Sequence, residues 1–357
     1  MDQQALDFLK QLVSIPTPSG WEQDGMRLIA KYLKENQVEG ARFDVHGNLI
    51  ASLNEQAPTK VMIEGHCDEI GFMVVYIDDN GFLYLCADGG VTSQIIVGDR
   101  VVIQGRKGPV NGVFGVRPPH LMKPDERKKL APSEVSEIAV DIGAKDKKEA
   151  LELVEIGAPA VIDAGWRPLA GTRVACRGFD DRIGAFIVAE VMRRLVGKPI
   201  NVAVHMVASI QEELGLIGGQ TASYDLNPDI GICVDVGFAT DANPEDKKRV
   251  GDIRLGDGPM LVCGPLYNPK FRQLVEASAD RLGLNLQRQV RARGNGTNAY
   301  SMRMTRGGAA VSLISIPLRY MHSPIEVIDL KDVEEIIQLI CDTLEHLPAN
   351  PNLTPDL

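Results

Sequence analysis

The stretch Val202-Ala203-Val204-His205-Met206-Val207-Ala208-Ser209-Ile210 is followed at once by Gln211-Glu212-Glu213. Almost every position is apolar, without the alternation expected of a strand that has one face in water. Such a run is typical of a strand buried on both faces of a parallel sheet. A similar strand is expected at residues 230–236, where the apolar run 230–234 is followed by a carboxylate, Asp235. These strands indicate an α/β fold with polar side chains at the strand ends.

The segments around these strands alternate between helical and extended patterns. Apolar residues recur at helical spacing at 183–195, 271–284 and 333–347, and residues 309–316 form a further apolar strand. Earlier in the chain, helices are expected at 4–14 and 23–35 and strands at 41–53 and 60–63. Near-continuous apolar strands between helices predict a doubly wound, mostly parallel sheet covered on both sides.

The sequence pattern between residues 70 and 165 differs from that of the rest of the chain. Short β-rich runs at 72–77, 82–86, 100–104 and 112–116 alternate with glycine turns, and helical patterns are few. We expect a small antiparallel, barrel-like domain inserted into the first one. The prediction is therefore one domain made of residues 1–69 and 166–357 and an inserted domain made of residues 70–165, which suits a length of 357 residues.

Composition excludes several classes of protein. A hydrophobic content of 44% is typical of a globular protein. The net charge of −10 argues against a nucleic-acid partner, because binding to nucleic acid needs a basic surface. No run reaches the roughly 18 apolar residues of a membrane span, and no secretory signal precedes the first helix. The six cysteines form no C-x-x-C pair and are expected to be reduced. A cytoplasmic location is the resulting expectation.

Polar clusters fall where ligands bind in open α/β sheets, just beyond the carboxyl ends of the strands. One further cluster opens a helix. The clusters are Gly65–Glu69, Gln211–Glu213, Asp235, His322 and Asp180–Arg182. Their shared location indicates a single site built from distant parts of the chain.

Two histidines and several carboxylates suit two divalent cations such as Zn²⁺, Co²⁺ or Mn²⁺. Two such ions about 3.5–4 Å apart polarise a carbonyl group and acidify a shared water, while another carboxylate moves the proton. Adjacent residues that leave a strand point in different directions, so one of Glu212 and Glu213 can bind a metal while the other acts as base. Asp68, two residues after His66, is placed to accept a ring N–H of that histidine.

Taken together, these clusters resemble the M42 metallo-aminopeptidases, which include the glutamyl and deblocking aminopeptidases. The order and spacing match along nearly the whole chain, and five motifs together are a specific signal. The motifs are Gly65-His66-Cys67-Asp68-Glu69-Ile70-Gly71-Phe72, Phe179-Asp180-Asp181-Arg182-Ile183-Gly184, Gln211-Glu212-Glu213-Leu214-Gly215, Asp235-Val236 and Arg319-Tyr320-Met321-His322-Ser323-Pro324.

The resemblance implies a specific division of roles. One carboxylate would bridge two divalent ions, Zn²⁺ or Co²⁺ first and Mn²⁺ as an alternative, and two residues would complete each site. The implied ligands are Asp180 as the bridge, His66 and Asp235 at one ion, and Glu213 and His322 at the other. Glu212 would be the general base, and Asp68 would orient His66.

The family fold implied by this resemblance is a doubly wound peptidase domain that carries an inserted β-rich dimerisation domain. The family commonly assembles as a hollow homo-oligomer, a tetrahedral dodecamer, whose chamber admits short peptides and keeps folded proteins out. The expected activity is removal of N-terminal residues from short peptides with a free amine. The partners would be such peptides and other copies of the chain, with no nucleic acid and no membrane.

Two positions depart from the family pattern. Family members often carry Gly-Gly-Thr-Asp-Ala where this chain has Gly294-Asn295-Gly296-Thr297-Asn298-Ala299, so a neutral Asn298 replaces an acid. That loop is expected near the substrate pocket, and the departure leaves the preferred N-terminal residue open. Cys67 stands where a Met or similar residue is usual, and a thiol beside a metal ligand is a candidate for oxidation.

Other polar residues are given structural roles. Asp181 is expected to cap a helix rather than to face a metal, and Glu69 is expected to be structural or solvated rather than a ligand. For Arg182, an ion pair with a neighbouring acid is at least as well supported as contact with a substrate carboxylate. His205 is expected in the core and His120 to be structural. His46 and His346 are expected to be solvated.

Three alternatives to the peptidase remain at this point. A glycoside hydrolase needs carboxyl groups that face each other about 5–5.5 Å apart or more, which adjacent residues such as Glu212 and Glu213 supply poorly. A related two-metal amidohydrolase, or deacylase, that acts on N-acylated amino acids would use nearly the same metal chemistry. A non-enzymatic scaffold is disfavoured because every candidate ligand and the candidate base are present.

Overall fold

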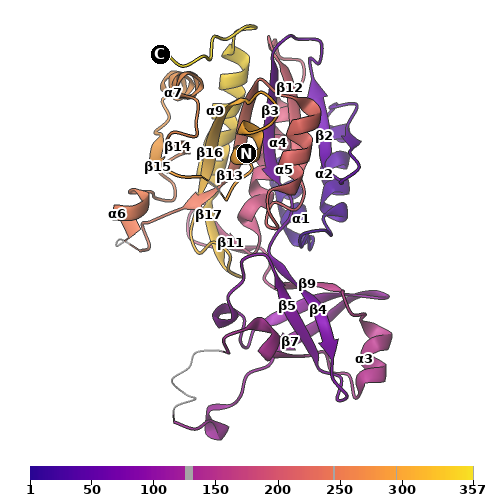
Figure 1. Cartoon of the computed structure of the whole chain (residues 1–357). Helices are drawn as coiled ribbons and strands as arrows, with labels where there is room; N and C mark the ends of the chain where they lie inside the picture. The colour runs from indigo at the N-terminus through magenta and orange to yellow at the C-terminus, as the bar shows by residue number, and fades with distance from the viewer. Residues whose placement is uncertain (125–131, 244–245, 295, 357) are drawn as a thin grey trace.

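An eight-stranded mixed sheet forms the centre of the larger part of the molecule, in the order β1-β2-β12-β3-β13-β16-β14-β15 (Figure 1). The computed structural model describes residues 1–124, 132–243, 246–294 and 296–356. The strands are β1 (Arg42–Phe43), β2 (Leu49–Leu53), β12 (Ala203–Ser209), β3 (Lys60–His66), β13 (Ile230–Phe238), β16 (Ala310–Leu318), β14 (Met260–Cys263) and β15 (Gln287–Val290).

The four central strands β12, β3, β13 and β16 run parallel to one another, whereas β2 and β14 join the sheet in the antiparallel sense. In this register Ser209 lies beside His66, and Asp235 lies beside Ser315. Parallel strands end at the same edge of a sheet. The polar residues that follow β3, β12 and β16 are therefore brought to one edge.

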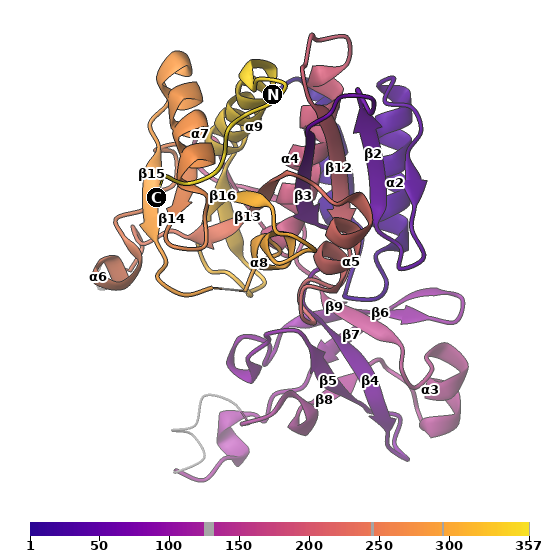
Figure 2. The same cartoon turned by 45° about the horizontal axis from the view of Figure 1, so that its top comes forward.

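Helices cover both faces of the sheet (Figure 2). In β3, Val61 and Ile63 belong to one core and Met62 to the other, as expected when side chains alternate across a strand. The first core contains residues of α1 (Gln3–Ser14), α2 (Gln23–Glu35), α4 (Phe179–Leu195), α7 (Pro269–Leu282) and α9 (Leu330–His346), and the second contains residues of α5 (Ile217–Leu226) and α8 (Ala299–Arg303). The doubly wound fold predicted from the sequence is confirmed.

A closed six-stranded barrel forms the smaller part of the molecule, with a hydrophobic core of its own that includes Phe72, Leu85 and Phe114. Closure pairs every strand edge, which an open sheet of this size does not do. In barrel order, the strands are β4 (Gly71–Ile77), β5 (Leu83–Asp88), β8 (Ala139–Asp141), β7 (Gly108–Phe114), β6 (Arg100–Gly105) and β9 (Pro159–Ile162), and α3 (Lys147–Leu153) packs beside them. The barrel-like insertion is therefore confirmed.

The barrel adjoins the edge where the central parallel strands end (Figure 1). Only residues 67–70 separate the end of β3 from the start of β4. The chain leaves the barrel after β9 and enters a small sheet of β10 (Arg167–Pro168), β11 (Arg173–Cys176) and β17 (Glu326–Asp329) before it reaches α4. Both crossings therefore pass close to the polar strand ends.

Some details differ from the sequence-based expectations. Asp235 was expected to end its strand, but β13 continues to Phe238 because it pairs with β16 along its whole length. The barrel strand expected at 112–116 is β7 (Gly108–Phe114), which begins earlier at its hairpin with β6. The elements α5, β14 and β15 were not anticipated. None of the helices in the described part of the chain combines the length and apolar character needed to cross a membrane.

Candidate metal centre

The predicted site residues from five separate segments surround one cavity of about 580 Å³ at this edge of the sheet. Most of its polar lining consists of residues singled out from the sequence. The apolar part of its wall includes Leu216, Val236, Phe238 and Met321. The predicted residues that line it are His66, Asp180, Glu212, Glu213, Asp235 and His322. Asp68 is fully buried beside them.

Asp180 lies between the two histidines. Its Oδ1 is 3.4 Å from Nε2 of His66, and its Oδ2 is 3.3 Å from Nε2 of His322. Asp180 and Asp181 at the start of α4 have non-helical backbone angles, so the chain bends there and the Asp180 side chain turns into the cavity. One carboxylate therefore faces an imidazole with each of its oxygen atoms.

Two groups of three residues share Asp180, and each has its donor atoms within 4.8 Å of one another. The first is His66, Asp180 and Asp235, and the second is Asp180, Glu213 and His322. A third combination joins His66 with both glutamates. The first two groups match the ligand sets that the family resemblance implied.

The hydrogen bonds of the two imidazole rings leave the same nitrogen facing the cavity. Nδ1 of His66 lies 3.1 Å from the backbone carbonyl oxygen of Asp68, and Nδ1 of His322 lies 3.0 Å from that of Gly90. A carbonyl oxygen only accepts hydrogen bonds, so Nδ1 carries the proton in both rings. Nε2 of each ring is then the nitrogen that faces the carboxylates, and it can bind a cation once it has lost its own proton.

Asp68 makes contacts beyond the one expected with His66. Its carboxylate lies 3.3 Å from Nδ1 of His66, but the shorter contact of that ring is to the Asp68 backbone carbonyl. The carboxylate accepts the backbone N–H groups of Glu212 and Glu213 at 3.0 and 3.1 Å, and the hydroxyl of Ser19 at 2.7 Å. Asp68 therefore fixes the turn that carries the two glutamates as well as supporting His66.

Glu212 is 8% exposed, and its Oε2 lies 3.8 Å from Nε2 of His66. Its Oε1 is buried and has no hydrogen-bond partner among the described residues. Burial, followed by the negative charges of neighbouring carboxylates, raises the pKa of Glu212 to about 9. The side chain is therefore a carboxyl group that readily holds a proton.

The other charges of the site are strongly coupled. Burial and the charge of Asp180 raise the pKa of Asp235 well above its ordinary value. Burial disfavours the charged ring of His66, but three neighbouring carboxylates, Glu212 foremost, raise its pKa well above the ordinary value. Hydrogen bonds to Asp180 and Glu213 raise the pKa of His322 to about 11. The carboxylates thus create a negative field that attracts cations.

Glu326 is a supporting residue that sequence reasoning missed. It is 2% exposed, and its two oxygens accept the backbone N–H groups of Asp180, at 3.1 Å, and of His322, at 3.0 Å. One side chain on β17 thereby holds the backbone of two predicted ligands. The only signal in the sequence was its place four residues after His322, which does not distinguish it from a solvated glutamate.

Asp181 has the capping role expected of it. Its Oδ1 accepts the N–H of Gly184 at 3.2 Å, and its Oδ2 accepts the N–H of His66 at the same distance. The two elements approach closely here, since a Cβ atom on Gly65 would lie 2.4 Å from the backbone carbon of Gly184. Asp181 therefore ties the start of α4 to the end of β3.

Arg182 forms the ion pair that was expected, with its Nη2 atom 3.0 Å from Oε2 of Glu69. Arg177 pairs with the same carboxylate. Arg182 is fully buried and Glu69 is 1% exposed, so the solvated alternative for Glu69 is wrong and the structural one is right. Arg182 also donates hydrogen bonds of 2.9 Å to the backbone carbonyl oxygens of Arg177 and Gly178, just before Asp180 in the chain.

Asn298, which departs from the family pattern, lies behind the cavity and is not one of the residues that line it. The side chain is 1% exposed, and its Nδ2 donates to Oε1 of Glu64 at 2.7 Å and to the hydroxyl of Ser209 at 3.0 Å. Its neighbour Thr297 lines the cavity. An acid at position 298 would face a buried carboxylate, so the amide suits this position.

The remaining histidines lie away from the site. His205 is largely buried on β12, and its Nδ1 lies 2.8 Å from the hydroxyl of Ser52. His46, His120 and His346 are exposed. The core location of His205 and the exposure of His46 and His346 agree with expectation.

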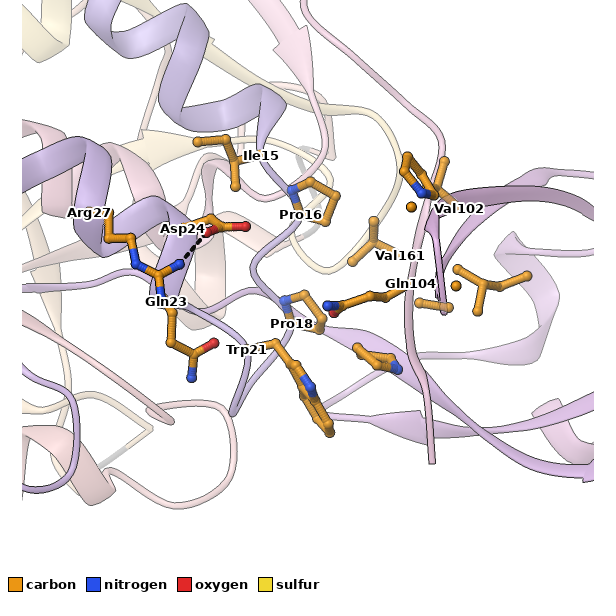
Figure 3. A pocket seen from close by; sticks show the side chains of 16 residues that line it. Ile15, Pro16, Pro18, Trp21, Gln23, Asp24, Arg27, Val102, Gln104 and Val161 are labelled. Atoms are coloured by element: carbon orange, nitrogen blue, oxygen red, sulfur yellow. Dashed lines mark hydrogen bonds and ion pairs between the residues drawn. The ribbon is translucent and has the colours of Figure 1, made fainter. Parts of the chain in front are cut away.

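A second, larger cavity of about 690 Å³ lies between the start of α2 and barrel strands β6 and β9 (Figure 3). Pro18 and Trp21 face it on one side and Val161 on the other, and Asp24 pairs with Arg27 at one end. None of the predicted metal ligands, nor Glu212, lines it. The smaller cavity is therefore the candidate site, because the histidines and carboxylates that could bind metal line it.

Comparisons with known proteins show the family to which the chain belongs. The model of the M42 glutamyl aminopeptidase family matches residues 47–339. Lysyl aminopeptidase of Pyrococcus furiosus is 35% identical over 342 residues, which are 96% of this chain and 97% of that protein. A TET aminopeptidase from a marine sediment archaeon of the Thaumarchaeota is 31% identical, with a TM-score of 0.90 over 97% of this chain and 98% of its own.

A further solved structure is the TET1 peptidase of Pyrococcus horikoshii, which can assemble into a tetrahedron or a large octahedral shell. It is 29% identical, and the likeness covers 96% of this chain and 100% of that chain with a TM-score of 0.85. The family match spans most of the sequence and includes the segments that meet in the cavity. The chain belongs to the M42 family of aminopeptidases.

Proposed function

We propose that this chain is a dinuclear, metal-dependent aminopeptidase that removes N-terminal residues from short peptides. The observation that carries the proposal is the position of Asp180, whose oxygens lie 3.4 and 3.3 Å from Nε2 of His66 and of His322. This arrangement supports a carboxylate that bridges two cations. Asp235 would complete one donor set and Glu213 the other.

The chemistry of the donor set fits two divalent ions. Imidazole nitrogen and carboxylate oxygen together suit Zn²⁺ or Co²⁺, with Mn²⁺ as an alternative. Several buried carboxylates in one cavity are costly unless cations compensate them. Both histidines have their Nδ1 atoms occupied by carbonyl oxygens, which is the second contact that metal-binding histidines usually make.

When bound, the ions would polarise the substrate carbonyl group and lower the pKa of the attacking water. Glu212 is the general base of the proposal, because it is buried beside the donor sets and its carboxyl group readily holds a proton. It would take one proton from the water that adds to the carbonyl carbon. It would then deliver that proton to the amine nitrogen as the C–N bond breaks.

The cavity favours a substrate with a free N-terminus. Its carboxylates attract the positive charge of an α-ammonium group, which an acylated amine lacks. Apolar side chains, among them Leu216, Phe238 and Met321, form part of the wall and suit the first side chain of a peptide. These features support an aminopeptidase over the related deacylase.

The test uses protein stripped of metal and supplied with Zn²⁺, Co²⁺ or Mn²⁺. Aminoacyl substrates with Leu, Glu, Lys or Ala are compared with their N-acylated forms and with an oligosaccharide. We expect hydrolysis of free-amine substrates, dependent on added metal, with two ions bound per chain. Preference for the acylated forms would support the deacylase, and metal-independent cleavage of the oligosaccharide would support the glycosidase.

We also propose that the chain acts within a large homo-oligomer, a dodecamer in the first instance. The support is the likeness, with a TM-score of 0.85, to a TET1 peptidase that can assemble into a tetrahedron or a large octahedral shell and to a PhTET1 structure with a dodecamer in its asymmetric unit. Short peptides would then be its partners.

A further inference from the structure

A turn of the barrel lies against two residues of one proposed ion site. β5 ends at Asp88, and Gly89 and Gly90 follow it. The backbone carbonyl oxygen of Gly90 lies 3.0 Å from Nδ1 of His322, which is 232 positions away in the sequence. A Cβ atom on Gly89 would lie 3.5 Å from Cβ of Glu213.

The turn leaves no space for a side chain beside the imidazole. A Cβ atom on Gly90 would lie 2.7 Å from Nδ1 and 3.0 Å from Cε1 of His322. Both distances are too short for ordinary contact, and the group that must move is the ring. Gly89 has a φ of +85° and rests on Ile70, whose Cγ2 atom would lie 2.8 Å from a Cβ atom there. The carbonyl of Gly90 is therefore held at a fixed place.

The carbonyl oxygens that contact Nδ1 of the two histidines come from different parts of the molecule. The carbonyl that faces Nδ1 of His66 belongs to Asp68, only two residues further along the chain. The carbonyl that faces Nδ1 of His322 belongs to the inserted barrel. The orientation of His66 is thus set within the larger part of the molecule, whereas that of His322 depends on the barrel.

We propose that Gly90 is a positioning residue through which the barrel completes the ion site of Glu213 and His322. Its carbonyl oxygen fixes the tautomer and the plane of the His322 ring, and its lack of a side chain allows the ring to reach Asp180. This inference rests on the proposed dinuclear function. It gives the barrel a part in one ion site that is separate from any part in assembly.

The test is Gly90→Ala in the full chain. Bound Zn²⁺ or Co²⁺ is counted by elemental analysis after dialysis against buffers of graded free metal concentration. We expect one ion per chain to bind as in the natural sequence. The other should bind about ten- to a hundredfold more weakly, because the new Cβ atom displaces the His322 ring from the carbonyl of Gly90, and breaking the contact between a metal ligand and its outer partner typically has an effect of this size. Excess metal should restore both the second ion and the hydrolysis rate.

Gly165→Ala is the matched control. Gly165 has an ordinary φ, and a Cβ atom there would meet nothing within 4 Å. This control should bind two ions with unchanged affinity. A general loss of folding in Gly90→Ala would instead lower the melting temperature and reduce the binding affinity for both ions.

The outcomes separate this inference from the proposed function. If the natural sequence binds fewer than two ions, the dinuclear function fails. If it binds two and Gly90→Ala binds both equally tightly, the inference about Gly90 is wrong. Should Gly90→Ala fail to fold, Ile70→Ala removes the support of the turn instead. A smaller but selective loss of one ion in that variant would support the proposal, and unchanged binding of both would overturn it.

Discussion

Asp180 is the residue on which both proposed ion sites depend, because each of its oxygens faces a different histidine. We predict that Asp180→Ala loses at least one of two bound ions, since no other carboxylate belongs to both of the donor groups that contain His66 with Asp235 and His322 with Glu213. Elemental analysis of the dialysed variant checks this. A variant that retained two tightly bound ions would refute the bridging role, provided that its melting temperature shows a folded protein.

Glu212 and its neighbour Glu213 allow a direct comparison of roles. We predict that Glu212→Gln keeps both ions and lowers kcat by about 10²–10⁴-fold, because an amide cannot take the proton of the attacking water. Steady-state kinetics and metal content are measured on the same preparation.

Glu213→Gln is the matched control for this prediction. It should lose metal affinity instead, since Oε1 of Glu213 lies 3.4 Å from Nε2 of His322 within one donor group. Near-normal turnover of Glu212→Gln would defeat the base role. Equal metal loss in both variants would show that Glu212 is a ligand.

At the scale of residues, the sequence revealed groups that carry chemistry but not groups that support them. His66 and Glu212 stand out because polar side chains follow apolar strands, and the family resemblance assigned their roles. Glu326 and Gly90 act only through contacts with residues far away in the chain. Nothing in the local sequence separates Glu326 from a solvated glutamate or Gly90 from a loop glycine, so their roles required the fold.

The start of α4 depends on the buried trio of Glu69, Arg177 and Arg182. We predict that Glu69→Gln lowers the free energy of unfolding by about 3–5 kcal/mol, because removing one partner leaves buried charge without compensation. Urea or guanidinium unfolding of the metal-free protein measures it. Glu35→Gln on α2, whose carboxylate makes only an exposed contact with Lys31, should change stability by less than about 0.5 kcal/mol. Equal effects in the two variants would contradict the prediction.

The contact of α9 with α4 should give an acid-sensitive contribution to stability. Glu334 pairs with Arg194 and with the N-terminal ammonium group, and these partners outweigh burial and lower its pKa to about 2. A lowered carboxyl pKa stabilises the folded state above the ordinary value of 4.5. That contribution is lost as the pH falls from there toward 2.

We therefore predict that Glu334→Gln is less stable than the natural sequence at pH 6, by roughly 1 kcal/mol because solvent screens the pair. The difference should shrink as the pH falls below 4.5. Urea unfolding at a series of pH values measures it. Glu335→Gln serves as the control, since Glu335 lies 3.6 Å from the half-exposed ammonium group of Lys331 on the same helix. A difference that grows on acidification would have the wrong sign for this mechanism.

At the scale of elements, long periodic segments were predictable and short or glycine-rich ones were not. Residues 202–210 and 23–35 indicated β12 and α2 because their side chains follow one clear pattern. The helix α5 begins near Gly218-Gly219, which weakens a helical pattern, and is fixed instead by packing of Ala222 and Leu226 against the sheet. Strands β14 and β15 have four residues each, too few to establish a period.

At the scale of the whole molecule, the fold places the site at the junction of two bodies. The cavity lies at the carboxyl edge of the sheet, and the barrel begins five residues after His66 and supplies the carbonyl that contacts His322. The related TET1 peptidase can assemble into a tetrahedron or a large octahedral shell. Closed symmetric assemblies of this kind bury some surfaces and leave others facing an interior.

If this chain forms such a shell with its sites inside, access to the sites should depend on the size of the substrate. We predict a particle of twelve times the chain mass of 38.9 kDa, measured by light scattering or native mass spectrometry. It should release the first residue of a short peptide. It should leave the same residue intact when that peptide forms the N-terminus of a tightly folded protein, because a folded domain cannot enter. The control is that fusion protein after unfolding and proteolysis, whose freed peptide should be cleaved again. Equal rates on the peptide and on the folded fusion would place the site on an outer surface, whatever the particle mass.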